Sequence, residues 1–76
     1  MDNGAYKKFR ELLVEARKST GLTQAELSLR LNRPQSFVSK YERGERRLDV
    51  IEFGEVAKAL DVDPVKWLAT FYRETQ

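Results

Sequence analysis

Apolar residues recur along most of the chain at helical spacing, and glycine and proline mark the breaks between these stretches. In the first stretch, Phe9, Leu12 and Leu13 share one face with Ala16, while charged residues occupy the other faces. No stretch shows the strict alternation typical of a strand. The pattern therefore predicts an all-α chain with five short helices, over about residues 5–18, 24–31, 35–43, 50–60 and 64–72.

Three of these predicted helices begin with a recognisable cap. Thr23 with Glu26, and Asp49 with Glu52, have the spacing of a capping box, in which each residue's side chain binds the other's backbone amide. Asp63 precedes a proline at the first helical position. Each cap contributes only about 1 kcal/mol, but together they fix the phases of three helices.

With the phases fixed, one set of apolar residues faces inward and predicts a single all-helical core. Leu29 falls off the apolar face of its helix, and Gly54 interrupts another helix at a cost of roughly 1 kcal/mol; the pattern explains neither. The predicted core residues are Leu27, Leu31, Phe37, Val38, Tyr41, Phe53, Val56, Ala57, Leu60, Trp67, Leu68 and Phe71.

The connection over residues 31–36 is too short for anything but a tight turn that joins two helices at a steep angle. Asn32 suits a turn because asparagine tolerates positive φ better than other non-glycine residues. Pro34 prevents the preceding helix from continuing. This part of the chain is therefore predicted to be a helix-turn-helix.

The helix after this turn has an outer face made of amide, hydroxyl and cationic groups. Glutamine can bind adenine bidentately, lysine suits the acceptors of guanine, and serine fits either. The pattern alone does not distinguish such a face from an ordinary solvated helix face, which is the commoner case. The residues of this face are Gln35, Ser36, Ser39, Lys40 and Arg43.

Composition narrows the functional classes. The chain has 76 residues, which indicates one domain, and it has no cysteine and no histidine. The usual metal ligands and nucleophile–base pairs are therefore missing, and Asp61 and Asp63 are better explained as helix-end residues than as catalytic carboxylates. We expect no enzyme activity and no cofactor or metal. Without an apolar leader or a bilayer-length apolar run, we expect a cytoplasmic protein with no membrane association.

Charge is distributed unevenly although the net charge is only +2. Residues 30–47 hold six basic and two acidic side chains, whereas residues 48–76 hold three basic and six acidic ones. A basic block of this kind is what a site for a polyanion needs, but a solvated charged face explains it equally well.

Three runs of the sequence resemble one known family. TQAEL at 23–27, PQSFVSKYERG at 34–44 and AKAL at 57–60 are similar, in residues and in spacing, to the Cro/repressor-type helix-turn-helix proteins, also called the XRE family. The resemblance covers about residues 6–71 and implies a lambda-repressor-like bundle that binds DNA. Relatives commonly have glycine where this chain has Asn32 and Asp61, which puts local stability in doubt but not function.

The resemblance implies roles residue by residue. Gln35, Ser36 and Lys40 would face bases in the major groove, with Ser39 contacting base or backbone. Arg17 and Glu42 would form a partly buried pair that fixes the angle between helices; their alternative is two unrelated surface charges. Expected contacts to the DNA backbone are Gln24, Arg33, Arg43, Arg46 and Arg47, although Arg43, Arg46 and Arg47 could equally be solubilising side chains.

The resulting hypothesis is a bacterial or phage-encoded transcriptional regulator, expected to be a repressor. It would bind double-stranded DNA as a homodimer on a near-palindromic operator, since one helix reads only a few base pairs. Phe71 and Tyr72 are the candidate dimer contacts, while Trp67 is expected in the core. No small-molecule ligand is evident. The alternative is a protein-interaction module, such as an antitoxin or a regulator that acts mainly through a protein partner.

Overall fold

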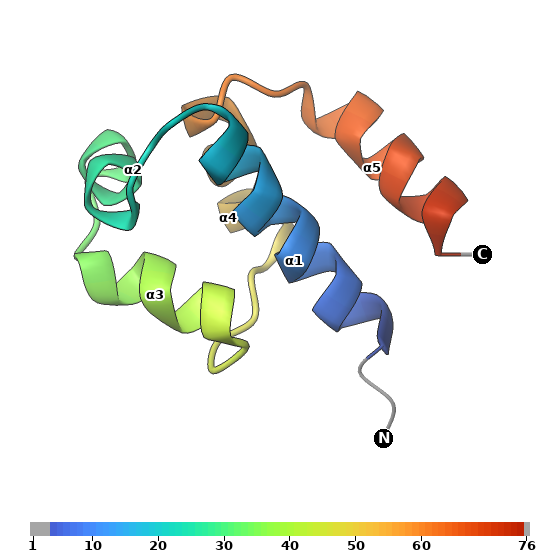
Figure 1. Ribbon diagram of the computed structural model, residues 1–76, viewed down its shortest axis with the longest axis horizontal. Helices are drawn as coiled ribbons and strands as arrows, with labels where there is room; N and C mark the ends of the chain where they lie inside the picture. Colours follow the sequence, from blue (N-terminus) through green and yellow to red (C-terminus); the bar gives the residue numbers. More distant parts are fainter. Residues whose placement is uncertain (1–3, 76) are drawn as a thin grey trace.

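The computed structural model describes residues 4–75, and these residues form an all-α bundle (Figure 1). In Figure 1, α2 and α3 lie to one side of α1, and α5 runs along its other side. The helices are α1 (Gly4–Ser19), α2 (Gln24–Leu31), α3 (Gln35–Arg43), α4 (Val50–Ala59) and α5 (Pro64–Glu74). No helix within this range is long and apolar enough to cross a membrane.

The caps read from the sequence determine where the later helices begin. Both capping boxes form, with Thr23 at the start of α2 and Asp49 at the start of α4. The Asp63 carboxylate accepts a hydrogen bond from the backbone N–H of Val65 at 2.9 Å, which starts α5. The end of α5 lies two residues beyond the expected Tyr72, because no glycine or proline follows to stop the helix.

The turn between α2 and α3 reverses the chain in a few residues. Asn32 has φ +56°, and its backbone N–H donates to the carbonyl of Leu29 at 3.1 Å. The N–H of Arg33 then donates to the Ser28 carbonyl at 3.0 Å. These two bonds satisfy the last carbonyls of α2 in the manner of a Schellman cap. Asp61, before α5, also has positive φ, so both positions where relatives commonly have glycine are left-handed here.

The core lies where α1, α2, α3 and α4 meet, and the predicted inward faces supply most of it. Leu31, Trp67 and Leu68 are only partly buried and pack at its edge. A ring of aromatic contacts extends it under α5, where Phe9 meets Phe53, Trp67 and Phe71 at centroid distances of 5.3 to 5.5 Å. The buried core consists of Leu13, Leu27, Phe37, Val38, Tyr41, Phe53, Val56, Ala57 and Leu60.

Two residues that the pattern left unexplained lie outside this core. Leu29 is 80% exposed on α2. A side chain added at Gly54 would meet no atom within 4 Å, so packing does not require a glycine at that position of α4.

Candidate nucleic-acid interface

Helix α3 separates its side chains into an inner and an outer face. Phe37, Val38, Tyr41 and Glu42 are buried. The outer face carries the residues expected to read bases: Gln35, Ser36 and Lys40 are exposed, and Ser39 is half-buried, with its hydroxyl donating to the Ser36 carbonyl at 3.3 Å. The structure therefore brings these four polar side chains to the solvent side of one short helix.

A buried ion pair fastens α3 to α1. Arg17 and Glu42 are each 8% exposed. Arg17 donates from Nε to Glu42 Oε2 at 2.7 Å and from Nη2 to Oε1 at 3.0 Å, a bidentate geometry. Its Nη1 donates to the Leu22 carbonyl at 2.8 Å. The hydrogen bond to Glu42 holds the pKa of Arg17 above its ordinary value, against the opposing effect of burial.

Gln24, expected at a phosphate, belongs to the same network. Its side-chain Nε2 donates to Glu42 Oε1 at 2.8 Å. A carboxylate only accepts hydrogen bonds, so Glu42 requires the NH₂ end of the Gln24 amide to face it. That NH₂ group has a second N–H, which keeps one donor for another acceptor. Gln24 thus links the buried pair to the surface at the start of α2.

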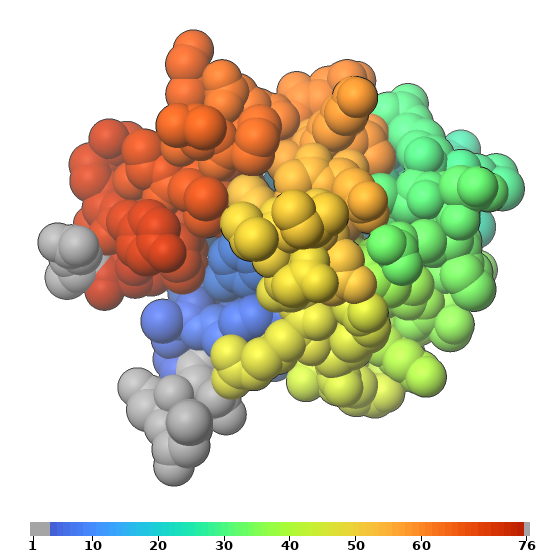
Figure 2. Space-filling model, turned by 180° about the vertical axis from the view of Figure 1, so that it is seen from behind, coloured from blue at the N-terminus to red at the C-terminus, as the bar shows by residue number. Residues whose placement is uncertain are grey.

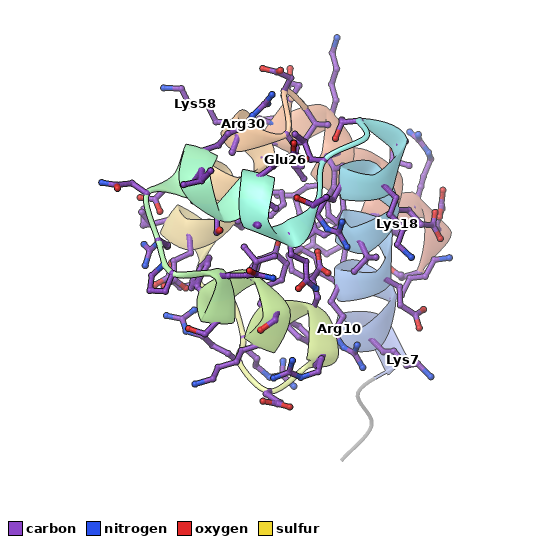
Figure 3. All side chains as sticks on the ribbon, turned by 60° about the vertical axis from the view of Figure 1, so that its left-hand side comes forward. Lys7, Arg10, Lys18, Glu26, Arg30 and Lys58 are labelled. Carbon is purple, nitrogen blue, oxygen red and sulfur yellow. The ribbon has the colours of Figure 1, made fainter. Side chains whose placement is uncertain are left out.

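The end of α3 is held from α1 as well. Arg10 donates from Nη1 to the backbone carbonyl of Glu42 at 2.8 Å, and Figure 3 shows Arg10 beside the last turn of α3. Gly44, whose φ is +80°, caps the helix after its last residue, Arg43. A Cβ at this position would lie 2.8 Å from Arg10 Nε, so only glycine fits here without moving that arginine.

The arginines expected on the DNA backbone are engaged within the protein. Arg33 Nη2 lies 3.1 Å from Glu55 Oε1, and Arg43 Nε lies 2.8 Å from Glu45 Oε2. Arg47 lies over the ring of Tyr6, with its guanidinium carbon 4.3 Å from the ring centroid. The basic block seen in the sequence is thus partly neutralised by nearby carboxylates.

Arg46 forms the shortest of these pairs. It donates from Nη2 to Glu52 Oε2 at 2.6 Å and from Nη1 to Oε1 at 3.0 Å. The Arg46 guanidinium and the backbone amide of Asp49 together lower the pKa of Glu52 to about 2. The sequence indicated Glu52 only as a helix cap and gave no sign of Glu55, whose partner Arg33 lies 22 residues away. Arg46 lies six residues before Glu52 but precedes α4, so helical spacing does not link the two.

The phenol of Tyr41 is a polar group without a partner. Its side chain is fully buried, and its hydroxyl is the one buried side-chain polar atom in the described part of the chain that has no hydrogen bond. Burial raises the pKa of Tyr41 well above its ordinary value of 10.0. An unsatisfied hydroxyl of this kind costs stability.

The two residues expected at a dimer contact lie in different environments. Phe71 is 7% exposed and is one of the aromatic side chains that pack around Phe9, so little of its surface is available to a partner. Tyr72 is 58% exposed. Large exposed apolar side chains that the sequence analysis did not single out are Val50, Ile51 and Val65.

Comparison with known proteins identifies the family. Residues 13–67 match the family model described as helix-turn-helix. An XRE-family like protein from Pseudomonas syringae pv. tomato str. DC3000 is 49% identical, with a TM-score of 0.93 over 97% of this chain and 90% of that one. No curated protein matches significantly.

Two solved restriction-modification controller proteins are also similar. C.AhdI from Aeromonas hydrophila is 34% identical, with a TM-score of 0.72 over 78% of this chain and 89% of that one. A point mutant of C.Esp1396I is 25% identical, with a TM-score of 0.87 over 99% and 95%. With most of its length matched by the family model, this chain belongs to the XRE family of helix-turn-helix proteins, a fold typical of DNA-binding regulators.

Proposed function

We propose that this protein is a sequence-specific transcriptional regulator, acting as a repressor, that inserts α3 into the major groove of double-stranded DNA. Gln35, Ser36, Ser39 and Lys40 read base edges, and Gln24 binds a phosphate at the start of α2. The observation that carries the proposal is the division of α3, whose inner face is fixed by the core and by Glu42 while its outer face is polar and exposed. A reading helix needs such a fixed position, because base contacts tolerate little displacement.

The proposed operator is a near-palindrome bound by two copies of the chain. One helix contacts only a few base pairs, and two half-sites about one helical turn apart combine their affinities. Exposed Tyr72 at the end of α5 is the proposed contact between copies. The similar restriction-modification controller proteins support a regulatory role for the fold.

Selection of bound duplexes from a random pool tests this function. We expect an enriched near-palindromic sequence, and we expect Gln35→Ala with Lys40→Ala to abolish the preference for it while thermal unfolding is unchanged. Lys66→Ala is the matched control, because Lys66 is exposed and lies in the hollow between α1 and α5, away from α3. An unenriched pool, with equal binding by all variants, would instead favour a protein-interaction module.

A further inference from the structure

Two arginines flanking α3 are held by carboxylates of a different helix. Arg33 precedes α3 and pairs with Glu55, and Arg46 follows α3 and pairs with Glu52; both carboxylates belong to α4. Figure 2 shows α4 and the segment 44–49 on the face opposite to that of Figure 1, with the segment 44–49 beside the end of α3. Two positive charges beside the proposed reading helix are therefore balanced by two negative charges within the fold.

The ring of Phe37 holds both guanidinium groups close to the carboxylates. The guanidinium carbon of Arg33 lies 4.5 Å from the ring centroid, and that of Arg46 lies 4.8 Å from it. Phe37 is a buried core residue of α3. Both arginines therefore have positions fixed relative to α3 by cation–π contact, and not by the carboxylates alone.

The arginines of these ion pairs are more open to solvent than Arg17. The side chains of Arg33 and Glu55 are 34% and 50% exposed, and that of Arg46 is 39% exposed, whereas that of Glu52 is 13% exposed. An exposed pair such as Arg33–Glu55 contributes little stability, so a phosphate can displace or share it at small cost. A guanidinium has several N–H donors and binds phosphate oxygens with the same bidentate geometry that it uses for a carboxylate.

We propose that Glu52 and Glu55 compete with DNA phosphates for Arg46 and Arg33, and so lower the affinity of the protein for every duplex. The proposal rests on the proposed function, since it assumes that α3 and its flanks meet DNA. Phosphate contacts carry no sequence information, so weakening them lowers affinity for selected and random sequences by the same factor. Base contacts then make up a larger share of the binding free energy.

The opposite role would be preorganisation, in which the carboxylates hold the arginines ready for phosphate. The two roles predict opposite changes in DNA affinity when a carboxylate is removed. Removing the negative charge strengthens binding if the carboxylates compete, and weakens it if they preorganise. Because Phe37 contacts both guanidinium groups, the arginines keep a position even without their carboxylates.

Fluorescence anisotropy with a random-sequence duplex and with the selected duplex tests the proposal, using Glu55→Gln, Glu52→Gln and the double variant. Glutamine preserves shape, and at position 52 it also preserves the capping box, which accepts Glu or Gln. We expect tighter binding of both duplexes, and a log–log salt slope steeper by up to about 0.9 for each released arginine. The gain in affinity of each single variant over wild type then shrinks about threefold between 50 and 200 mM salt, and that of the double variant about tenfold.

Glu15→Gln is the matched control, because it changes the net charge equally at an exposed position of α1 that faces α5. Glu55→Gln is also made together with Arg33→Gln, where it should no longer change affinity if Glu55 acts through Arg33. Binding of Glu52→Gln and Glu55→Gln equal to that of Glu15→Gln, or weaker than wild type, overturns the inference. Wild type that binds no duplex at low salt overturns the proposed function itself.

Discussion

Helix α3 has two kinds of arginine–carboxylate pair, one beneath it and one beside it. Beneath it, Arg17 and Glu42 are buried and connected to Leu22 and Gln24 by further hydrogen bonds. Beside it, Arg33 and Arg46 meet Glu55 and Glu52 at the surface. The chemical groups are the same, but the pair beneath α3 is more deeply buried and has further hydrogen bonds.

Because of this difference, the buried pair stabilises the fold, whereas the arginines of the surface pairs can exchange their carboxylates for another anion. A buried ion cannot be satisfied by water, so loss of its partner leaves a desolvated charge and destabilises the fold. A surface ion returns to water, so loss of its partner costs little stability and leaves the charge available to another ligand. Mutation of the buried pair should therefore mainly lower stability, and mutation of a surface carboxylate should mainly change DNA affinity.

The largest expected effect is on the buried pair. Glu42→Ala should lower the free energy of unfolding by about 3–5 kcal/mol, because it leaves Arg17 charged and buried without its partner. Urea denaturation followed by circular dichroism measures it. Arg17→Met combined with Glu42→Leu should recover much of the loss, and a loss below about 1 kcal/mol for Glu42→Ala would show that water replaces the carboxylate.

Gly44→Ala tests the close packing at the end of α3. Alanine at φ +80° costs about 1–2 kcal/mol, and its Cβ also displaces Arg10 from the carbonyl of Glu42. Gly21→Ala is the control, since Gly21 has φ +78° but no atom within 4 Å of an added Cβ. Thermal unfolding should rank Gly44→Ala as the more destabilising; equal losses would mean that Arg10 moves without cost.

Tyr41→Phe should raise the free energy of unfolding by about 1 kcal/mol. The hydroxyl is fully buried without a hydrogen bond, and removing it relieves a desolvation penalty that phenylalanine does not have. Equilibrium denaturation shows whether the free energy of unfolding rises or falls. Destabilisation would indicate that the hydroxyl is bonded in solution, for example by a buried water.

The surface pair should give a smaller effect on stability. Glu55→Gln is expected to change the free energy of unfolding by less than about 1 kcal/mol, and added salt should reduce the change further, because exposed charges are screened. Denaturation at low and high salt measures this. A large loss of stability that does not depend on salt would show that Glu55 behaves like the buried Arg17–Glu42 pair and not like a surface ion pair.

Lowering the pH should reveal how much Glu52 contributes to stability. Its pKa falls from 4.5 to about 2 on folding, so its stabilising effect is complete above about pH 4.5 and is lost as the pH falls toward 2. The free energies of unfolding of wild type and Glu52→Gln should be measured between pH 5 and pH 2.5. The difference between the two free energies should become smaller as the pH falls. A constant difference would mean that the Glu52 pKa is not shifted by folding.

Much of the fold followed from local rules. The caps at Thr23, Asp49 and Asp63 placed three helix starts, because a cap satisfies amides within three residues of itself. Asn32 could be assigned to the turn because few residues accept positive φ. The base-reading roles of Gln35, Ser36, Ser39 and Lys40 came from resemblance to a family and stay predictions, since the polarity of an exposed face does not name its ligand.

The helices, their phases and the division of α3 into an apolar and a polar face follow from the sequence alone, because they depend on residues a few positions apart. The family resemblance implied the Arg17–Glu42 pair, whereas the pairing of Arg33 with Glu55 became visible only in the folded chain. Arg33 lies 22 residues from Glu55, and Arg17 lies 25 residues from Glu42, so no periodicity links them. Folding also decided their burial, and burial determines whether an ion pair fixes a helix or stays open to exchange.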